Sequence, residues 1–116
     1  MRKYIVVRLQ VEGLHNWPEA REVLPEMGFL SDKHRHMFHI KMIKEVLHND
    51  RDIEIIQFKR KVQNDLNLLF YDNAVGCIDF GRRSCEDLAE LLIKNYDLTC
   101  AEVLEDGENG AIIYSN

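Results

Sequence analysis

The first half of the chain contains two stretches in which apolar and polar side chains alternate. From Tyr4 to Val11 apolar residues occupy both the even and the odd positions, so a strand here would carry apolar side chains on both faces. This pattern favours a strand with at least one buried face. Met37 to Leu47 alternates over its first half and leads into an Asn-Asp turn at 49–50. Residues 13–28 hold both prolines and are expected to form a long loop.

The second half begins with a helical repeat. Apolar residues recur at three- and four-residue steps from Ile55 to Phe70, which is the pattern of an amphipathic helix. A second helix is expected after Ser84, a good N-cap, with Leu88 and Leu92 in its buried stripe. These two segments predict two consecutive helices.

The C-terminal part predicts a hairpin. Thr99 to Leu104 and Ala111 to Tyr114 have the composition of strands, and the loop 106–110 between them is rich in residues that accept unusual backbone angles. The predicted order is strand, strand, helix, helix, strand, strand. We expect one α+β domain over residues 1–116, long enough to bury about two thirds of its unfolded surface.

Composition and charge narrow the possible partners. A formal net charge of -5 opposes nonspecific binding to phosphate backbones, so Lys59–Lys61 is expected to be a solvated helix face. The apolar runs are far shorter than the ~18 residues of a membrane span, and Met1–Lys3 leads directly into a strand. We therefore expect a cytoplasmic protein that binds neither nucleic acid nor membrane. Cys77, Cys85 and Cys100 lack a Cys-x-x-Cys spacing and are expected as free thiols.

Three histidines near the ends of the first two predicted strands are the candidate metal ligands. His34 and His36 are two residues apart, so both project from one face of a strand. If the first strand ends near His15 and lies alongside, the three imidazoles converge. Three protein ligands with one open position are typical of catalytic zinc. The alternative is a polar strand start at 34–36 and an unrelated loop residue at His15.

The histidine segments also resemble those of a known family. Val11–His15 is similar to a strand ending F-x-A-x-H, and His34–His36 is similar to the H-G-H that leads a long second strand. This pair of segments is found in the 6-pyruvoyl-tetrahydropterin synthase and 6-carboxy-tetrahydropterin synthase family. Its members are zinc-dependent tunnelling-fold (T-fold) enzymes of pterin and 7-deazaguanine synthesis.

The rest of the chain resembles the same family in the same order. Ile53–Lys59 is similar to its I-D-F-x-x-L-K stretch, with Glu54 in place of the aspartate. Ser84–Ala89 resembles the start of its second helix, P-T-x-E-x-L-A. Val103–Glu105, followed by Gly110–Tyr114, resembles its C-terminal hairpin with a V-x-E core. The resemblance covers nearly the whole chain.

The resemblance implies a T-fold unit, which is a four-stranded antiparallel sheet with two helices on one face (ββααββ). It implies zinc at His15, His34 and His36, and a pterin or purine-like heterocycle whose amidine edge is held by Glu105. Glu86 either frames this ligand or is a helix-cap acid. Family members form barrels with ligand sites between protomers, so we expect a homo-oligomer, which would also cover unpaired sheet edges.

Four polar residues near these motifs are expected to have other places in the structure or allow another interpretation. Glu105 could be a plain surface acid of the last turn, and Asp106 and Glu108 are expected to be surface residues. His39 is three residues after His36, so it is expected on the opposite sheet face and is not predicted to be a ligand.

The chain departs from the family at its proton-transfer residues. The family has a catalytic cysteine in the loop before H-G-H and an Asp-His pair between the helices, but residues 16–33 contain no cysteine and residues 66–80 no histidine. Asp72, Asp79 or a partner-chain residue could replace the base. Cys85 lies at a helix start, which would favour thiolate, although a buried inert thiol is the preferred interpretation.

Two functional classes therefore stay open for this chain. The first is a zinc-dependent lyase of the family type, which would act on a pterin or guanine-derived heterocycle. The second is a non-catalytic T-fold module that binds or sequesters a purine-like nucleotide.

Overall fold

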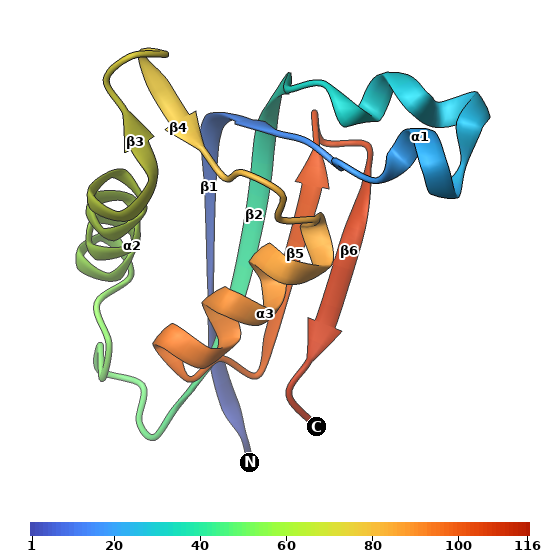
Figure 1. Cartoon of the computed structure of the whole chain (residues 1–116). Coiled ribbons are helices and arrows are strands. Elements are labelled where there is room, and N and C mark those ends of the chain that lie inside the picture. Colours follow the sequence, from blue (N-terminus) through green and yellow to red (C-terminus); the bar gives the residue numbers. More distant parts are fainter.

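The computed structural model describes residues 1–116 and has an α+β architecture, as predicted (Figure 1). One mixed sheet of six strands is combined with four helical segments. Along the chain the elements are β1 (Lys3–His15), α1 (Ala20–Val23), the 3-10 helix η1 (Pro25–Ser31), β2 (His34–Val46), α2 (Ile55–Phe70), β3 (Tyr71–Asp72), β4 (Cys77–Asp79), α3 (Cys85–Tyr96), β5 (Cys100–Glu105) and β6 (Asn109–Tyr114).

The sheet differs from the predicted four-stranded sheet because it has two further strands. Its strand order is β3-β4-β1-β2-β5-β6, so the four predicted strands are neighbours within it. All pairs are antiparallel except β4, which runs parallel to β1. The expectation of a four-stranded sheet is not confirmed. The sequence did not indicate β3 and β4 because, with two and three residues, they are too short to show an alternation.

The pairing of β4 with β1 depends on a close approach at Gly13. Gly13 lies opposite Ile78 in the ladder, and a Cβ atom at this position would lie 3.1 Å from the ring of Phe80. The backbone N–H of Phe80 donates to the carbonyl of Leu14 at 2.8 Å. This contact anchors the connector between α2 and α3 at the same end of β1 that carries His15.

Both long helices begin at side-chain caps that the sequence contains. Glu54 precedes α2 and accepts hydrogen bonds from the backbone N–H groups of Ile56 and Gln57. Ser84 precedes α3 and forms a reciprocal capping box with Asp87. The predicted bounds of the first helix are confirmed, and the second helix starts directly after the predicted N-cap.

The two helices share one hydrophobic core with a single face of the sheet (Figure 1). The fully buried residues Phe38, Phe80, Val62, Leu88 and Leu92 come from strands, connector and both helices. This core ends at the three histidine positions, because Phe38 packs edge-on against the rings of His15 and His36.

The first loop is more ordered in secondary structure than the sequence predicted. It contains α1, of four residues, and the seven-residue η1, which are too short to show a helical repeat. The backbone N–H of Trp17 donates to the carbonyl of Leu30 at 2.8 Å, which joins the two ends of this segment. No helix in the chain combines the length and the apolar character that crossing a membrane requires.

Candidate metal centre

The register of β1 and β2 brings the three histidines together. His15 is paired with His34, and Gly13 is paired with His36, so all three side chains lie on the helix-covered face. The ring centroids are 4.5 Å apart for His15 and His34, and 5.1 Å apart for His34 and His36. One nitrogen of each ring lies within 4.8 Å of the others. The predicted convergence of the three imidazoles is thus present in the structure.

Each imidazole has its Nδ1 atom occupied by an acceptor. Nδ1 of His15 lies 2.9 Å from the carbonyl of Arg83, and Nδ1 of His34 lies 2.9 Å from the carbonyl of Asp32. Nδ1 of His36 lies 2.7 Å from Oδ2 of Asp106. Carbonyl and carboxylate oxygens only accept, so each Nδ1 must carry the proton in these contacts. The lone pair of each neutral ring is therefore on Nε2.

The buried Nε2 atom of His15 has no hydrogen-bond partner. It lies 2.9 Å from Oε2 of Glu105, but both of these atoms offer lone pairs when the imidazole is neutral. Nε2 of His36 similarly lies 3.5 Å from Oε1 of Glu105. A buried polar atom without a donor is costly, and a bound cation would satisfy it. Three imidazoles whose second nitrogens are fixed by acceptors fit a zinc ion well.

Burial keeps the central histidine in the form that binds metal. His15 is only 7% exposed, and desolvation of its ring lowers its pKa from the ordinary value, against the opposing hydrogen bond to Arg83 and the charge of Glu105. The lowered pKa favours the neutral imidazole, which is the form that binds metal.

Asp106 has a role that its sequence position did not reveal. It is exposed, as expected, but its carboxylate bridges Nδ1 of His36 and the backbone N–H of Met37. These two hydrogen bonds, first that from Met37 and then that from His36, hold its pKa below the usual range. Asp106 adopts a left-handed backbone with φ of 56°, directly after the end of β5. No periodic pattern marks it, since only the pairing of β5 with β2 brings it to His36.

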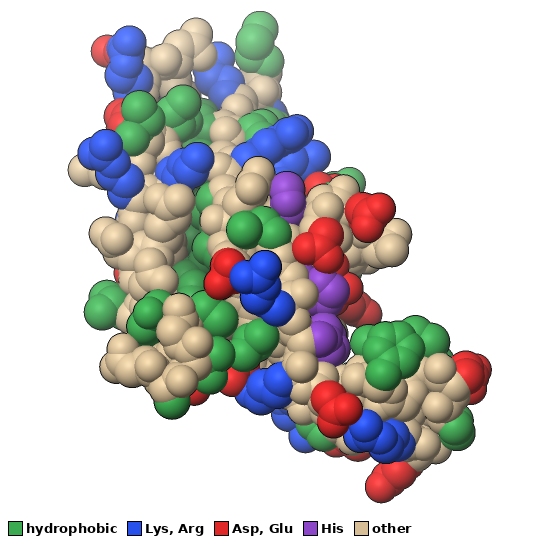
Figure 2. All heavy atoms as spheres, turned by 90° about the horizontal axis from the view of Figure 1, so that it is seen from above, with side chains coloured by type: hydrophobic (Ala, Val, Ile, Leu, Met, Phe, Trp, Pro, Cys, Tyr) green, Lys and Arg blue, Asp and Glu red, His purple; other side chains and the backbone are tan.

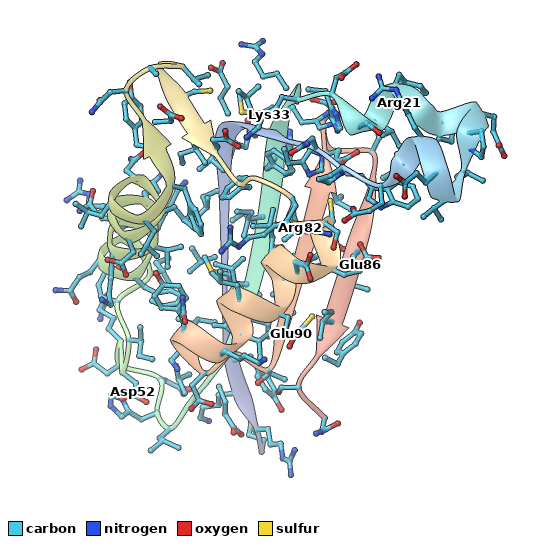
Figure 3. The ribbon with its side chains drawn as sticks, viewed as in Figure 1. Arg21, Lys33, Asp52, Arg82, Glu86 and Glu90 are labelled. Atoms are coloured by element: carbon cyan, nitrogen blue, oxygen red, sulfur yellow. The ribbon has the colours of Figure 1, made fainter.

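A cavity of about 450 Å³ opens beside the histidines, at the start of α3. It is lined by His15, His34, Glu105, Glu86 and Trp17, among others, so both predicted ligand-binding acids face one space. Glu86 and Arg82, which also line the cavity, lie at the start of α3 and close to the segment that contains α1 (Figure 3). Figure 2 shows histidine side chains at the molecular surface with carboxylates beside them.

Cys85 borders this cavity as a protonated thiol. Burial, followed by the charges of Glu105 and Glu86, raises its pKa to about 12. Its Sγ atom donates to Oε2 of Glu105 at 3.8 Å. The possibility of a thiolate at the helix start is therefore wrong, because desolvation and two carboxylates outweigh the helix dipole.

The other proposed bases do not line this cavity. The carboxylate of Asp79 is paired with the ammonium of Lys33 and accepts from the N–H of Gly81, and that of Asp72 accepts from the N–H of Ala74. His39 lies on the opposite sheet face, as expected, where a Cβ atom at Gly107 would lie 3.4 Å from its ring. No aspartate lines this cavity, and the histidines that line it are the candidate metal ligands His15 and His34.

Comparisons with known proteins do not assign the chain to a family. No protein-family model matches the chain, and the comparison with curated proteins found no match.

Replacing Asp106 by Asn should weaken metal binding without unfolding the turn. Asparagine tolerates the left-handed backbone at this position, but it removes the charge that fixes and polarises His36. We expect the zinc dissociation constant to rise about 10- to 100-fold in a chelator competition assay. Glu108→Gln, in the same turn, is the matched control and should leave the affinity unchanged.

Only one thiol of the native, metal-free protein should react rapidly with a disulfide reagent at pH 8. Cys85 and Cys100 are buried, and desolvation raises the pKa of both, whereas Cys77 is half-buried. At a pKa of about 12, about 10⁻⁴ of Cys85 is thiolate at pH 8. All three thiols should react in denaturant. Loss of the rapid phase in Cys85→Ser rather than in Cys77→Ser would contradict this assignment.

Proposed function

We propose that this chain is a zinc-binding protein of the T-fold type that takes a pterin or guanine-derived heterocycle in the cavity beside the metal. The observation that carries the proposal is the convergence of three imidazoles, which place one nitrogen each within 4.8 Å of the others and have every Nδ1 atom beside an acceptor. The neighbouring order β1-β2-β5-β6, with both long helices on one face, is compatible with the proposed T-fold unit.

His15, His34 and His36 would hold the zinc ion, which when bound supplies a Lewis acid that polarises oxygens of the ligand. Glu105 projects into the adjoining cavity from the end of β5. Its two oxygens suit two parallel N–H donors, which is the pattern of the amidine edge of a pterin or guanine ring. Glu86 lines the same cavity and is exposed, so it can frame the ligand.

A second candidate, the non-catalytic binding module, is favoured by the lack of a thiolate, an aspartate or a histidine beyond the metal ligands at this site. Cys85 holds its proton, and the carboxylates of Asp72 and Asp79 are engaged elsewhere. Zinc and ligand binding alone would then serve transport, sensing or sequestration of a purine-like nucleotide. The lyase chemistry of the family stays the alternative, with a base that a partner chain would have to contribute.

A homo-oligomer is part of the same proposal, as is a cytoplasmic location. One edge of β6 has no strand partner, and such edges are usually covered. The sheet face opposite the helices also exposes apolar side chains, among them Tyr4, Val6, Ile112 and Tyr114. Association through these surfaces would bury both the free edge of β6 and the exposed apolar side chains.

Purified protein should contain one zinc ion per chain by elemental analysis. His34→Gln should lose most of this zinc, whereas His39→Gln, on the opposite face, should retain it. Because neutral imidazole is the ligand, occupancy should fall as the pH drops below ~6.5. Burial lowers the pKa of His15, so its protonation should add to the loss only at still lower pH. Retention of full zinc by His34→Gln would contradict the site.

Glu105→Gln should weaken the binding of pterins or guanine nucleotides to zinc-saturated protein. The change replaces one acceptor oxygen by a donor, and a hydrogen bond to a charged group contributes about 1.5 to 3 kcal/mol. Isothermal titration with neopterin and GMP measures this difference, with Glu108→Gln as the control. Equal affinity in the two variants would reject the anchoring role of Glu105.

Turnover of dihydroneopterin triphosphate should lie far below the ~10 s⁻¹ that is typical of enzymes. General acid-base groups contribute about 10²- to 10⁴-fold each, and this cavity has neither the cysteine nor the histidine of the family. Tight binding without turnover supports the binding module. Turnover near the typical value would support the lyase, and its loss in Cys85→Ala would identify that thiol as the replacement base.

A further inference from the structure

We infer that Glu105 is a fourth protein ligand of the metal, so that the site is closed by the chain itself until another molecule displaces the carboxylate. This inference rests on the proposed metal site and adds a second task for Glu105 at that site. Its basis is the position of the Glu105 carboxylate relative to the histidines.

The strand pairing fixes that position. Glu105 is paired with Phe38 across β5 and β2, and Phe38 is two residues from His36 on the same face. The backbone N–H of Asp106 donates to the carbonyl of Met37 at 2.8 Å, so the contact between the two strands continues one step beyond β5. Glu105 thus comes from a different strand and approaches the histidines from the side of His36.

Two distances match those between atoms that share one ion, one to His15 and one to His36, whereas the mutual approach within 4.8 Å holds for the three imidazoles alone. Bonds of about 2.0 to 2.1 Å in a tetrahedral zinc site place neighbouring ligand atoms about 3.3 Å apart. Oε2 of Glu105 is 2.9 Å from Nε2 of His15, and Oε1 is 3.5 Å from Nε2 of His36. Both contacts lie close to the expected separation.

Direct contact between these atoms needs a positive charge between them, which either a second ring proton or a metal ion can supply. When the rings are neutral, with the proton on Nδ1, the carboxylate faces two nitrogen lone pairs. Lone pairs repel at this range unless a positive charge lies among them. A divalent ion shared by the three imidazoles and Glu105 removes the repulsion and satisfies the buried Nε2 of His15.

The surroundings hold the carboxylate in place without neutralising it. The thiol of Cys85 donates to Oε2 from 3.8 Å, and no lysine or arginine forms an ion pair with Glu105. The side chain is 30% exposed, which leaves it reachable from the cavity. A heterocycle that takes both oxygens through its N–H groups would have to draw Glu105 away from the metal, and would thereby open a coordination position.

Cobalt(II)-substituted protein tests this inference by absorption spectroscopy. A closed four-ligand site should give the intense visible bands of four-coordinate cobalt, and millimolar azide should leave them unchanged, because no position is open. In Glu105→Gln the spectrum should change, azide should perturb it, and the zinc dissociation constant should rise at least tenfold. Glu108→Gln should behave like the unmodified chain. Circular dichroism establishes that each variant is folded.

The outcomes separate this inference from the metal site itself. If the unmodified chain binds neither zinc nor cobalt, the proposed function fails. If it binds both but azide readily changes its cobalt spectrum, the site is open and Glu105 is not a ligand. The same conclusion follows if Glu105→Gln keeps the spectrum and affinity of the unmodified chain. The azide test needs no variant, so it decides the matter even if Glu105→Gln does not fold.

Discussion

The antiparallel ladder between β1 and β2 is the constraint on which the rest of the structure depends. It joins Lys3–His15 to His34–Val46 over thirteen consecutive pairs, and its last pair is His15 with His34. A slip of one residue would move every inward side chain of one strand to the opposite face. The burial of Leu9, Phe38 and Met42 opposes such a slip, since each would leave the core. The hydrophobic core therefore sets the geometry of the three candidate metal ligands, His15, His34 and His36.

The sequence contained enough information for the long elements and for the three histidines. The helical repeat in α2 persists over sixteen residues, and Ser84 carries a cap that the structure uses. Alternation in β1 and β2 placed His34 and His36 on one face. The short elements α1, β3 and β4 could not be predicted in this way, because two to four residues do not define a period. Their positions depend on tertiary contacts such as the N–H of Phe80 with the carbonyl of Leu14.

The hydrogen-bond acceptors of the three histidines could not be predicted from sequence patterns either, but for a different reason. Two of them, at Arg83 and Asp32, are backbone carbonyls, which every residue possesses and no motif can mark. The third, Asp106, resembles any acid in an exposed turn until β5 pairs with β2. The Cys85 thiol shows the same limit, because a helix start favours thiolate in isolation, whereas desolvation and nearby carboxylates raise its pKa. The sequence shows which ionisable groups are near one another along the chain. The balance between the helix dipole, desolvation and nearby carboxylates depends on the folded structure.

Glu105 could serve both as a metal ligand and as an acceptor for a bound heterocycle, and this bears on whether the site is catalytic. Catalysis of the proposed kind needs a base within reach of the reacting proton, and apart from the histidines the titratable side chains that could serve as one in this cavity are Cys85, Glu86 and Glu105. A carboxylate that completes the coordination sphere is compatible with that arrangement, because an ion held by four protein ligands stabilises the strand ends around it. The same carboxylate is the best acceptor in the cavity for a heterocycle with paired N–H donors. Competition between metal and ligand for Glu105 would couple occupancy of the cavity to the state of the metal, which suits a binding or sensing protein better than an efficient lyase.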